Sequence, residues 1–142
     1  MAVYGQAAAG LKQGGKLFAA DLMLAGGDLD RVKRICGNFL GGMAIGSYQD
    51  HAAGLKASGL RVENKYDLTS QFLSSVRIGL QHSLDMLEGL SLLSEPDRIQ
   101  RTGAFAAQLA TWKSLYDLAE AQKIAVTGLL AVKEAGSAET RT

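Results

Sequence analysis

Cysteine and proline are almost missing from this chain of 142 residues, which contains one of each. The single cysteine, Cys36, excludes an intrachain disulfide and any zinc site built from a cysteine cluster. Because Cys36 falls on an apolar helical face of the sequence, we interpret it as a small buried thiol. The single proline, Pro96, leaves long stretches without the residue that most strongly interrupts helices. These absences favour long, continuous helices.

An excess of charge of one sign is missing as well, since the net charge is +1 and charged residues make up 20% of the chain. Nucleic-acid binding usually requires a basic stripe, so we expect no nucleic-acid partner. The longest uncharged run covers residues 35–49, shorter than the roughly 20 apolar residues that a transmembrane helix needs. No signal peptide is evident at the N-terminus. We therefore expect a cytoplasmic chain without a transmembrane segment.

Strand and hairpin signals are also missing, because apolar and polar residues do not alternate over a useful length and no Asn-Gly or Asp-Gly pair occurs. We predict an all-α fold, a long antiparallel helical hairpin with shorter glycine-rich N-terminal helices arranged like a bundle. The length favours one domain. Its expected parts are the glycine-rich helices over 1–59, the hairpin over 60–132 and a tail over 133–142.

Periodicity and capping residues place the expected helices. The first covers Gly15–Ala25, and Asp28 can cap a second by accepting hydrogen bonds from free backbone amides. The hairpin consists of a helix over about Arg61–Leu92 and a helix over about Pro96–Val132. Ser94 and Pro96 between them are typical of a helix start.

The last predicted helix has a seven-residue period that is typical of a coiled-coil seam. Two series follow this period, and they are Phe105, Trp112, Ala119 and Val126 beside Leu109, Tyr116, Lys123 and Leu130. Lys123 is the polar interruption. We predict that the chain forms a homo-oligomer through Phe105, Leu109, Trp112, Tyr116 and Leu130.

Glycine is abundant where a helix is expected, at Gly37, Gly41, Gly42 and Gly46. Each glycine inside a helix costs about 1 kcal/mol relative to alanine, so this segment needs an explanation. One alternative is a contact site, because glycines four residues apart let another helix approach closely. The others are a broken helix with a glycine-rich loop and a lipid-surface segment. The sequence leaves these alternatives open.

No arrangement of residues in the sequence predicts catalysis. Residues 10–17 come close to a phosphate-binding loop, but Leu17 replaces the Ser or Thr that would hold magnesium. His51 and His82 lack the Glu-x-x-His spacing of di-iron bundles. Trp112 and Tyr116 could stack on a cofactor, although their place in the seam favours packing. We therefore expect no enzyme activity, no cofactor and no metal site.

A resemblance to a known family rests on the segment HSLDMLEGLSLLSEPDRIQRTGAFAAQLATWKSLYDLAEAQKIA. It combines a long amphipathic helix, a short proline turn at Pro96 and a second helix rich in Ala, Gln and Leu. The pattern is carried by Ile99, Gln100, Phe105 and Gln108. Over about residues 66–131 the chain resembles phasins, the helical proteins that coat polyhydroxyalkanoate granules. The resemblance implies a surface-coating role without catalytic residues.

The leading prediction is a non-enzymatic helical structural protein that acts through amphipathic surfaces. It would self-associate and could coat a hydrophobic granule or lipid surface, because burial of one leucine or phenylalanine contributes about 1.5–3 kcal/mol. The alternative is a subunit of a multi-protein assembly, such as a phage particle, a secretion apparatus or a filament. A small helical enzyme or ligand-binding bundle is the third possibility.

Overall fold

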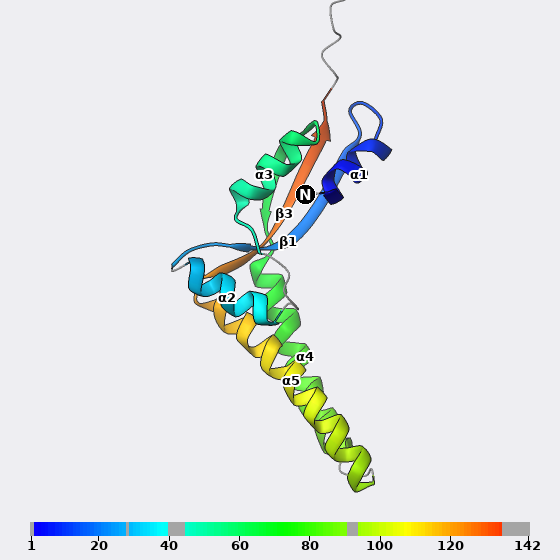
Figure 1. Ribbon diagram of the computed structural model, residues 1–142, viewed down its shortest axis with the longest axis vertical. Helices are drawn as coiled ribbons and strands as arrows, with labels where there is room; N and C mark the ends of the chain where they lie inside the picture. The colour runs from blue at the N-terminus through cyan, green and yellow to red at the C-terminus, as the bar shows by residue number, and fades with distance from the viewer. Residues whose placement is uncertain (1, 28, 40–44, 91–93, 135–142) are drawn as a thin grey trace, which may run out of the picture.

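The fold is mixed α/β, with a twisted sheet at one end of the molecule and a long helical hairpin at the other (Figure 1). The computed structural model describes residues 2–27, 29–39, 45–90 and 94–134. Over these residues the helices and strands are, in chain order, α1 (Ala2–Gly10), β1 (Lys16–Leu24), α2 (Leu29–Phe39), α3 (Tyr48–Ala57), β2 (Leu60–Asp67), α4 (Thr69–Leu90), α5 (Glu95–Glu120) and β3 (Ile124–Lys133).

The last strand in the chain is the central strand of the sheet, whose order is β1-β3-β2. β3 is antiparallel to both neighbours. It pairs with β1 along its whole length, from Leu24↔Ile124 to Lys16↔Val132. Its pairing with β2 shifts register between Val62 and Asn64, as at a β-bulge. The paired residues are therefore 100 to 116 positions apart in sequence between β1 and β3, and 60 to 73 positions apart between β2 and β3.

The all-α prediction is wrong, because three segments expected to be helical form this sheet. Gly15–Ala25 contains β1, the start of the predicted third helix is β2, and the end of the predicted fourth helix is β3. β3 is mostly buried, and its side chains at Ile124, Leu129 and Ala131 are fully buried. A mostly buried strand has a short apolar sequence, which cannot be distinguished from a buried helix by period alone.

The predicted coiled-coil seam is also wrong beyond residue 120. α5 ends at Glu120, and Leu130 lies in β3 rather than on a helix. The turn at residues 121–123 includes Gln122 with a positive φ of 56°, a conformation that cannot continue a right-handed helix. The seven-residue period from Phe105 to Leu130 therefore crosses from a helix into a strand.

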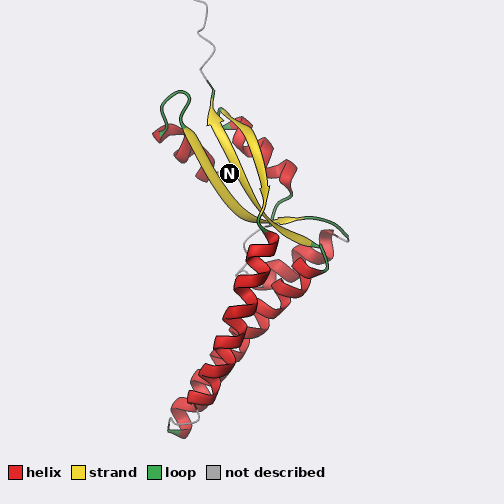
Figure 2. Cartoon of the chain, turned by 180° about the vertical axis from the view of Figure 1, so that it is seen from behind, coloured by secondary structure: helices red, strands yellow, loops and turns green. Residues whose placement is uncertain are grey.

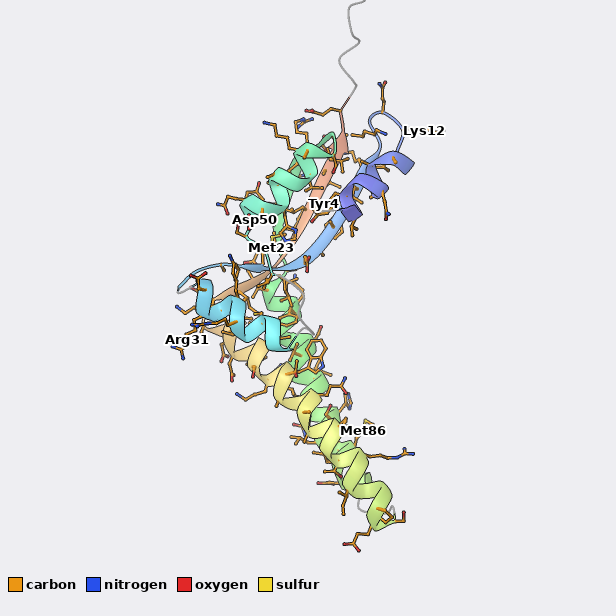
Figure 3. All side chains as sticks on the ribbon, viewed as in Figure 1. Tyr4, Lys12, Met23, Arg31, Asp50 and Met86 are labelled. Carbon is orange, nitrogen blue, oxygen red and sulfur yellow. The ribbon has the colours of Figure 1, made fainter. Side chains whose placement is uncertain are left out.

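One face of the sheet is covered by α1 and α3, and Figure 2 shows the strands in front of both helices when the molecule is viewed from behind. The core on the covered face consists of Ala8, Met23, Leu55, Leu60, Leu129 and Ala131. The hydroxyl of Tyr4 lies 2.6 Å from Nδ1 of His51 and joins α1 to α3. Lys133 Nζ donates to the carbonyls of Ala8 and Leu11 at 2.7 and 2.8 Å, which fixes the end of α1 to β3. Figure 3 shows Tyr4 on the side of α1 that faces α3.

A second core lies where the sheet meets the hairpin. It contains Leu24, Val32, Cys36, Ile45, Leu115, Ala119 and Ile124, which come from β1, α2, α5, β3 and the segment before α3. Cys36 is fully buried, as the sequence predicts, and burial raises the pKa of its thiol. This core fixes the base of the hairpin to the sheet.

The predicted helical hairpin is present in shorter form, with α4 of 22 residues and α5 of 26 residues. Pro96 lies in the first turn of α5, as expected. Away from the sheet the two helices contact mainly each other, and Ile78, Leu84, Met86 and Ile99 are more than half exposed (Met86 is labelled in Figure 3). Among the described residues, neither of these long helices, nor any other, combines the length and apolar character of a membrane span.

Candidate functional site

The strongest candidate site is a pocket with both polar and apolar walls at the junction of the sheet and the hairpin, with a volume of about 430 Å³. We call it the junction pocket. It is lined by Ala25, Asp67, Thr69, Leu73, Ala119, Glu120, Gln122, Ile124 and Ala125. These residues come from the ends of β1, β2 and α5 and from the starts of α4 and β3. Pockets of this size and position are typical of small-molecule sites.

Asp67 and Thr69 form the polar wall of the junction pocket. The Thr69 N–H donates to Oδ1 of Asp67 at 2.9 Å, and the Val126 N–H donates to Oγ1 of Thr69 at 3.1 Å. Hydrogen bonding to the Thr69 side chain and then to its N–H holds the pKa of Asp67 below its ordinary value of 3.8. The Asp67 carboxylate is therefore ionised at neutral pH and held at the start of α4, where the helix dipole favours a negative charge.

Gln122, which also lines the junction pocket, has a left-handed backbone, with φ of 56°. Such a conformation costs about 1 kcal/mol or more for a residue with a side chain. Its N–H donates to the Ala119 carbonyl at 3.0 Å, and the next N–H, from Lys123, donates to the Leu118 carbonyl at 2.8 Å. Backbone strain of this kind is frequent beside ligand sites. Beside it, Glu120 accepts a hydrogen bond from the Tyr116 hydroxyl at 3.3 Å and adds a second carboxylate.

A second pocket, of about 320 Å³, lies between α4 and α5. We call it the hairpin cavity. It is lined by Phe72, Ser75, Val76, Gly79, Leu80, Ser83, Leu109 and Trp112. Among the described residues, no charged side chain lines it. Within the described residues, no group of three or more His, Cys, Asp or Glu side chains could hold a metal ion.

The structure separates the interaction residues predicted from the seam. Leu109 and Trp112 line the hairpin cavity together. Phe105 and Tyr116 lie on α5 and are half-buried, whereas Leu130 lies in the sheet. Self-association through this set stays a prediction, and so do contacts with a granule surface or with other assembly subunits.

The predicted glycine contacts are only partly within the described residues. Gly37 lies in α2, and Gly46 lies just before α3, where its carbonyl accepts from the Leu24 N–H at 2.9 Å. A Cβ at Gly46 would lie 3.3 Å from both Asp50 Cβ and His51 Nε2, so this glycine serves a close contact within the chain. Gly41 and Gly42 lie outside the described residues.

Sequence reasoning missed the junction pocket because its residues lie in turns and strand ends that were assigned to helices. One signal was available, since Asp67 two residues before Thr69 is a pattern that frequently marks a helix start. That signal predicts an end to the preceding element near residue 67. The helix that we predicted over Arg61–Leu92 ignored this signal, because it continues through residue 67.

By sequence, the chain matches no protein family and no curated protein. Its structure, in contrast, is similar to solved enzymes. A sarcosine dimethylglycine methyltransferase assigned in Galdieria sulphuraria matches 93% of the chain with a TM-score of 0.72 and 16% identity, and a mycolic acid cyclopropane synthase matches 93% with a TM-score of 0.74 and 13% identity. Phosphoethanolamine N-methyltransferase 2 of Haemonchus contortus, solved with S-adenosylhomocysteine, matches 94% with a TM-score of 0.69 and 16% identity.

The matched regions are only part of these enzymes. The chain spans 46% of the first, 52% of the second and 30% of the third. At these identities the likeness establishes the fold, which is a mixed α/β arrangement shared with about half of a methyltransferase. The phasin resemblance is therefore wrong, because it depended on an all-helical chain. The prediction of a non-enzymatic structural protein is wrong as well, because the solved structures that share this fold are enzymes.

Proposed function

We propose that the chain forms the acceptor-binding part of an S-adenosylmethionine-dependent methyl-transfer enzyme. The observation that carries the proposal is the match of nearly the whole chain to about half of such enzymes. The remaining part, which would hold the cofactor, is supplied by further polypeptide or by a partner chain.

The uncovered face of the sheet supports the proposal. Phe18 and Tyr66 are 54% and 42% exposed there, and their ring centroids lie 6.1 Å apart. They approach each other above Gly128, where a Cβ would lie 2.7 Å from Cζ of Phe18. Two exposed aromatic rings on an open sheet face form an apolar surface that isolated domains seldom leave uncovered. Another layer of the same enzyme would bury it.

The outer edge of β1 also supports the proposal that further polypeptide completes the enzyme. The Ala25 N–H donates toward β3, to the Lys123 carbonyl, whereas the Leu24 N–H donates in the opposite direction, to the Gly46 carbonyl. Alternate amides of an antiparallel strand point to opposite neighbours, so the amides of Phe18 and Ala20 point outward. Within the described residues, this edge is engaged only at Leu24, which forms an isolated bridge with Ser47. The rest of the edge, from Lys16 to Met23, is a site for strand addition.

The described residues do not fit S-adenosylmethionine by themselves. A nucleotide-like cofactor would be expected at a glycine turn between a strand and a helix, and Gly26 and Gly27 form such a turn after β1. However, a Cβ at Gly27 would lie 2.8 Å from Nζ of Lys123, so the lysine side chain fills the turn. This chain would therefore bind and orient the acceptor and exclude water, while other residues hold the cofactor.

The junction pocket favours an acceptor that carries an amine. Asp67 is held ionised beside Thr69, and Glu120 lies on the same pocket. Two carboxylates attract a cationic or hydrogen-bond-donating group. Two of the similar structures are named for methylation of small amine compounds, which agrees with this choice.

The test uses the protein tagged and purified from its own cells, with whatever polypeptide accompanies it. The preparation is incubated with methyl-labelled S-adenosylmethionine and a panel of small amines. We expect labelled product, and we expect Ala25→Trp to abolish it by filling the junction pocket while binding of S-adenosylhomocysteine is unchanged. Ala106→Trp, at an exposed position on α5, should keep full activity. A preparation that neither binds S-adenosylhomocysteine nor transfers label would contradict the proposal.

A further inference from the structure

The outer edge of β1 is closed at the carboxyl end of the strand and open before it. The Leu24 N–H donates to the Gly46 carbonyl at 2.9 Å, and the Leu22 N–H donates to Oδ1 of Asp21 at 2.8 Å. The first of these contacts accompanies an isolated parallel bridge between Leu24 and Ser47. The outward amides that are open to a partner strand therefore lie nearer the start of β1.

β1 and β2 run in the same direction, because each is antiparallel to β3, which lies between them. The chain passes from β1 to β2 by way of α3, which lies on the covered face of the sheet (Figure 2). A connection of this kind between parallel strands of one sheet is right-handed in about 98% of cases. When the helices face the viewer and both strands point upward, β2 therefore lies to the right of β1.

The same rule applies to α1, which lies on the same face of the sheet as α3. Ala8 of α1 and Leu55 of α3 belong to one core. If a strand joins β1 through α1, a right-handed connection places β1 to the right of that strand. The strand then lies at the outer edge of β1 and runs parallel to it. The outer edge of β2, on the other side of the sheet, is excluded by the same rule.

The composition and position of α1 indicate that a neighbour is missing. No charged residue occurs over Ala2–Gly10, and Val3 is 71% exposed. A surface helix normally presents charged side chains opposite its buried face, whereas a helix that is apolar all round is buried. In Figure 2 part of α1 projects past the outer edge of β1. A strand added at this edge would lie beneath that part of the helix.

We propose that the outer edge of β1 binds a β-strand that runs parallel to β1 and joins it through α1. The inference rests on the proposed function in one respect, that further polypeptide completes the enzyme. Because α1 covers one face of this edge and Phe18 and Tyr66 leave the other face apolar, the new strand is apolar on both faces. Two copies of this chain paired through the same edge, across a two-fold axis perpendicular to the sheet, would instead have antiparallel strands.

The direction of the partner strand is read from Hα–Hα contacts by NMR, in the protein purified from its own cells. The odd-numbered residues of β1 turn their amides to β3, as Ala25 does, so the Hα atoms of Leu17 and Ala19 point to the outer edge. An antiparallel partner would bring its Cα atoms to about 4.5 Å from these residues and give strong Hα–Hα cross-peaks. We expect amide–Hα contacts to the new strand and no such cross-peaks.

β3 supplies the internal control, because its pairing with β1 is antiparallel. Phe18 is opposite Leu130 and Ala20 is opposite Gly128, and the amides of these two pairs are turned away from each other. Their Hα–Hα cross-peaks should be strong in the same spectrum. The absence of such cross-peaks at the outer edge then reports the direction of the strand and not a weak signal.

Two proline substitutions test which edge of the sheet holds the partner. Ala20→Pro removes an amide from the outer edge of β1. Lys65→Pro removes one from the outer edge of β2, because the Leu68 N–H donates to the Val126 carbonyl of β3 and residue 65 has the opposite phase. We expect Ala20→Pro to lower the thermal unfolding midpoint of the native preparation by at least about 2 °C more than that of the isolated chain. Lys65→Pro should lower both midpoints equally.

Strong Hα–Hα cross-peaks at the outer edge of β1, no contacts from a further strand there, or an extra loss for Lys65→Pro alone would overturn the inference. Neither measurement depends on methyl transfer, so the two proposals can be told apart. A parallel strand in a preparation that transfers no label would contradict only the proposed function. Labelled product from a preparation with an antiparallel strand would contradict only this inference.

Discussion

The two ends of the molecule are stabilised in different ways. At the sheet end, β3 pairs with two strands that are distant in sequence, and α1 and α3 complete a core with Leu55, Leu60 and Leu129 almost fully buried. At the hairpin end, α4 and α5 contact mainly each other and leave apolar side chains exposed. The comparison indicates that the sheet and its junction contribute most of the stability, whereas the far part of the hairpin contributes less.

Truncation of one leucine at each end gives the largest expected contrast. Leu129→Ala should lower the free energy of unfolding by about 2–5 kcal/mol, because Leu129 is fully buried in the central strand. Leu84→Ala on the hairpin should change it by less than about 0.5 kcal/mol, because Leu84 is 53% exposed. Urea unfolding of both variants measures the contrast. Equal losses would show that the hairpin is as tightly packed as the sheet.

A pair of proline substitutions tests which edge of β1 is open. Ala19→Pro should cost about 3 kcal/mol, because it removes a hydrogen bond to β3. Ala20→Pro should cost clearly less in the isolated chain, because its N–H points to the unpaired edge. Thermal unfolding followed by circular dichroism compares the two. A larger loss for Ala20→Pro would reverse our assignment of the edges.

A smaller effect is expected for the hydrogen bond between α1 and α3. Tyr4→Phe should cost about 1 kcal/mol by removing the contact to His51. Burial, and then the charge of Asp21, raise the pKa of Tyr4 above its ordinary value of 10.0. The unfolded chain therefore loses this proton first, so stability is fully present below about pH 10 and falls as the pH rises further.

The measurement for Tyr4 is the urea midpoint between about pH 8 and pH 11. The wild type should lose more stability than Tyr4→Phe over this range, and the gap between them should shrink as the pH rises. Parallel pH curves for the two proteins would show that the Tyr4 hydroxyl does not titrate with folding.

The smallest effect is expected on the hairpin surface. Lys113 Nζ lies 2.7 Å from Oδ1 of Asp117 one turn later on α5, but both side chains are more than half exposed. Such pairs contribute about 0.3–0.5 kcal/mol at most. Lys113→Ala should therefore leave the urea midpoint almost unchanged in about 0.5 M salt. A loss above about 1 kcal/mol would place this ion pair in a tighter network than its exposure indicates.

The same contrast explains what the sequence could predict. Helices α4 and α5 and the start of α5 near Pro96 follow from local periodicity and from a local breaker, so they were predictable. β3 was not, because it is a continuous apolar run that continues the seven-residue spacing of α5. Its pairing with β1 depends on contacts between residues 100 to 116 positions apart in sequence. The junction pocket requires those pairings, and so no local pattern could assemble Asp67, Thr69 and Gln122.

The most direct test of the account is amide hydrogen exchange along β1, measured by NMR in the isolated chain and in the protein purified from its own cells. In the isolated chain we predict slow exchange at Leu17 and Ala19 and fast exchange at Phe18 and Ala20. In the native preparation Phe18 and Ala20 should become protected as well, because another strand extends the sheet. Equal protection of all four amides in the isolated chain, or fast exchange at Phe18 and Ala20 in both samples, would contradict the proposal that another strand of a larger enzyme extends this sheet.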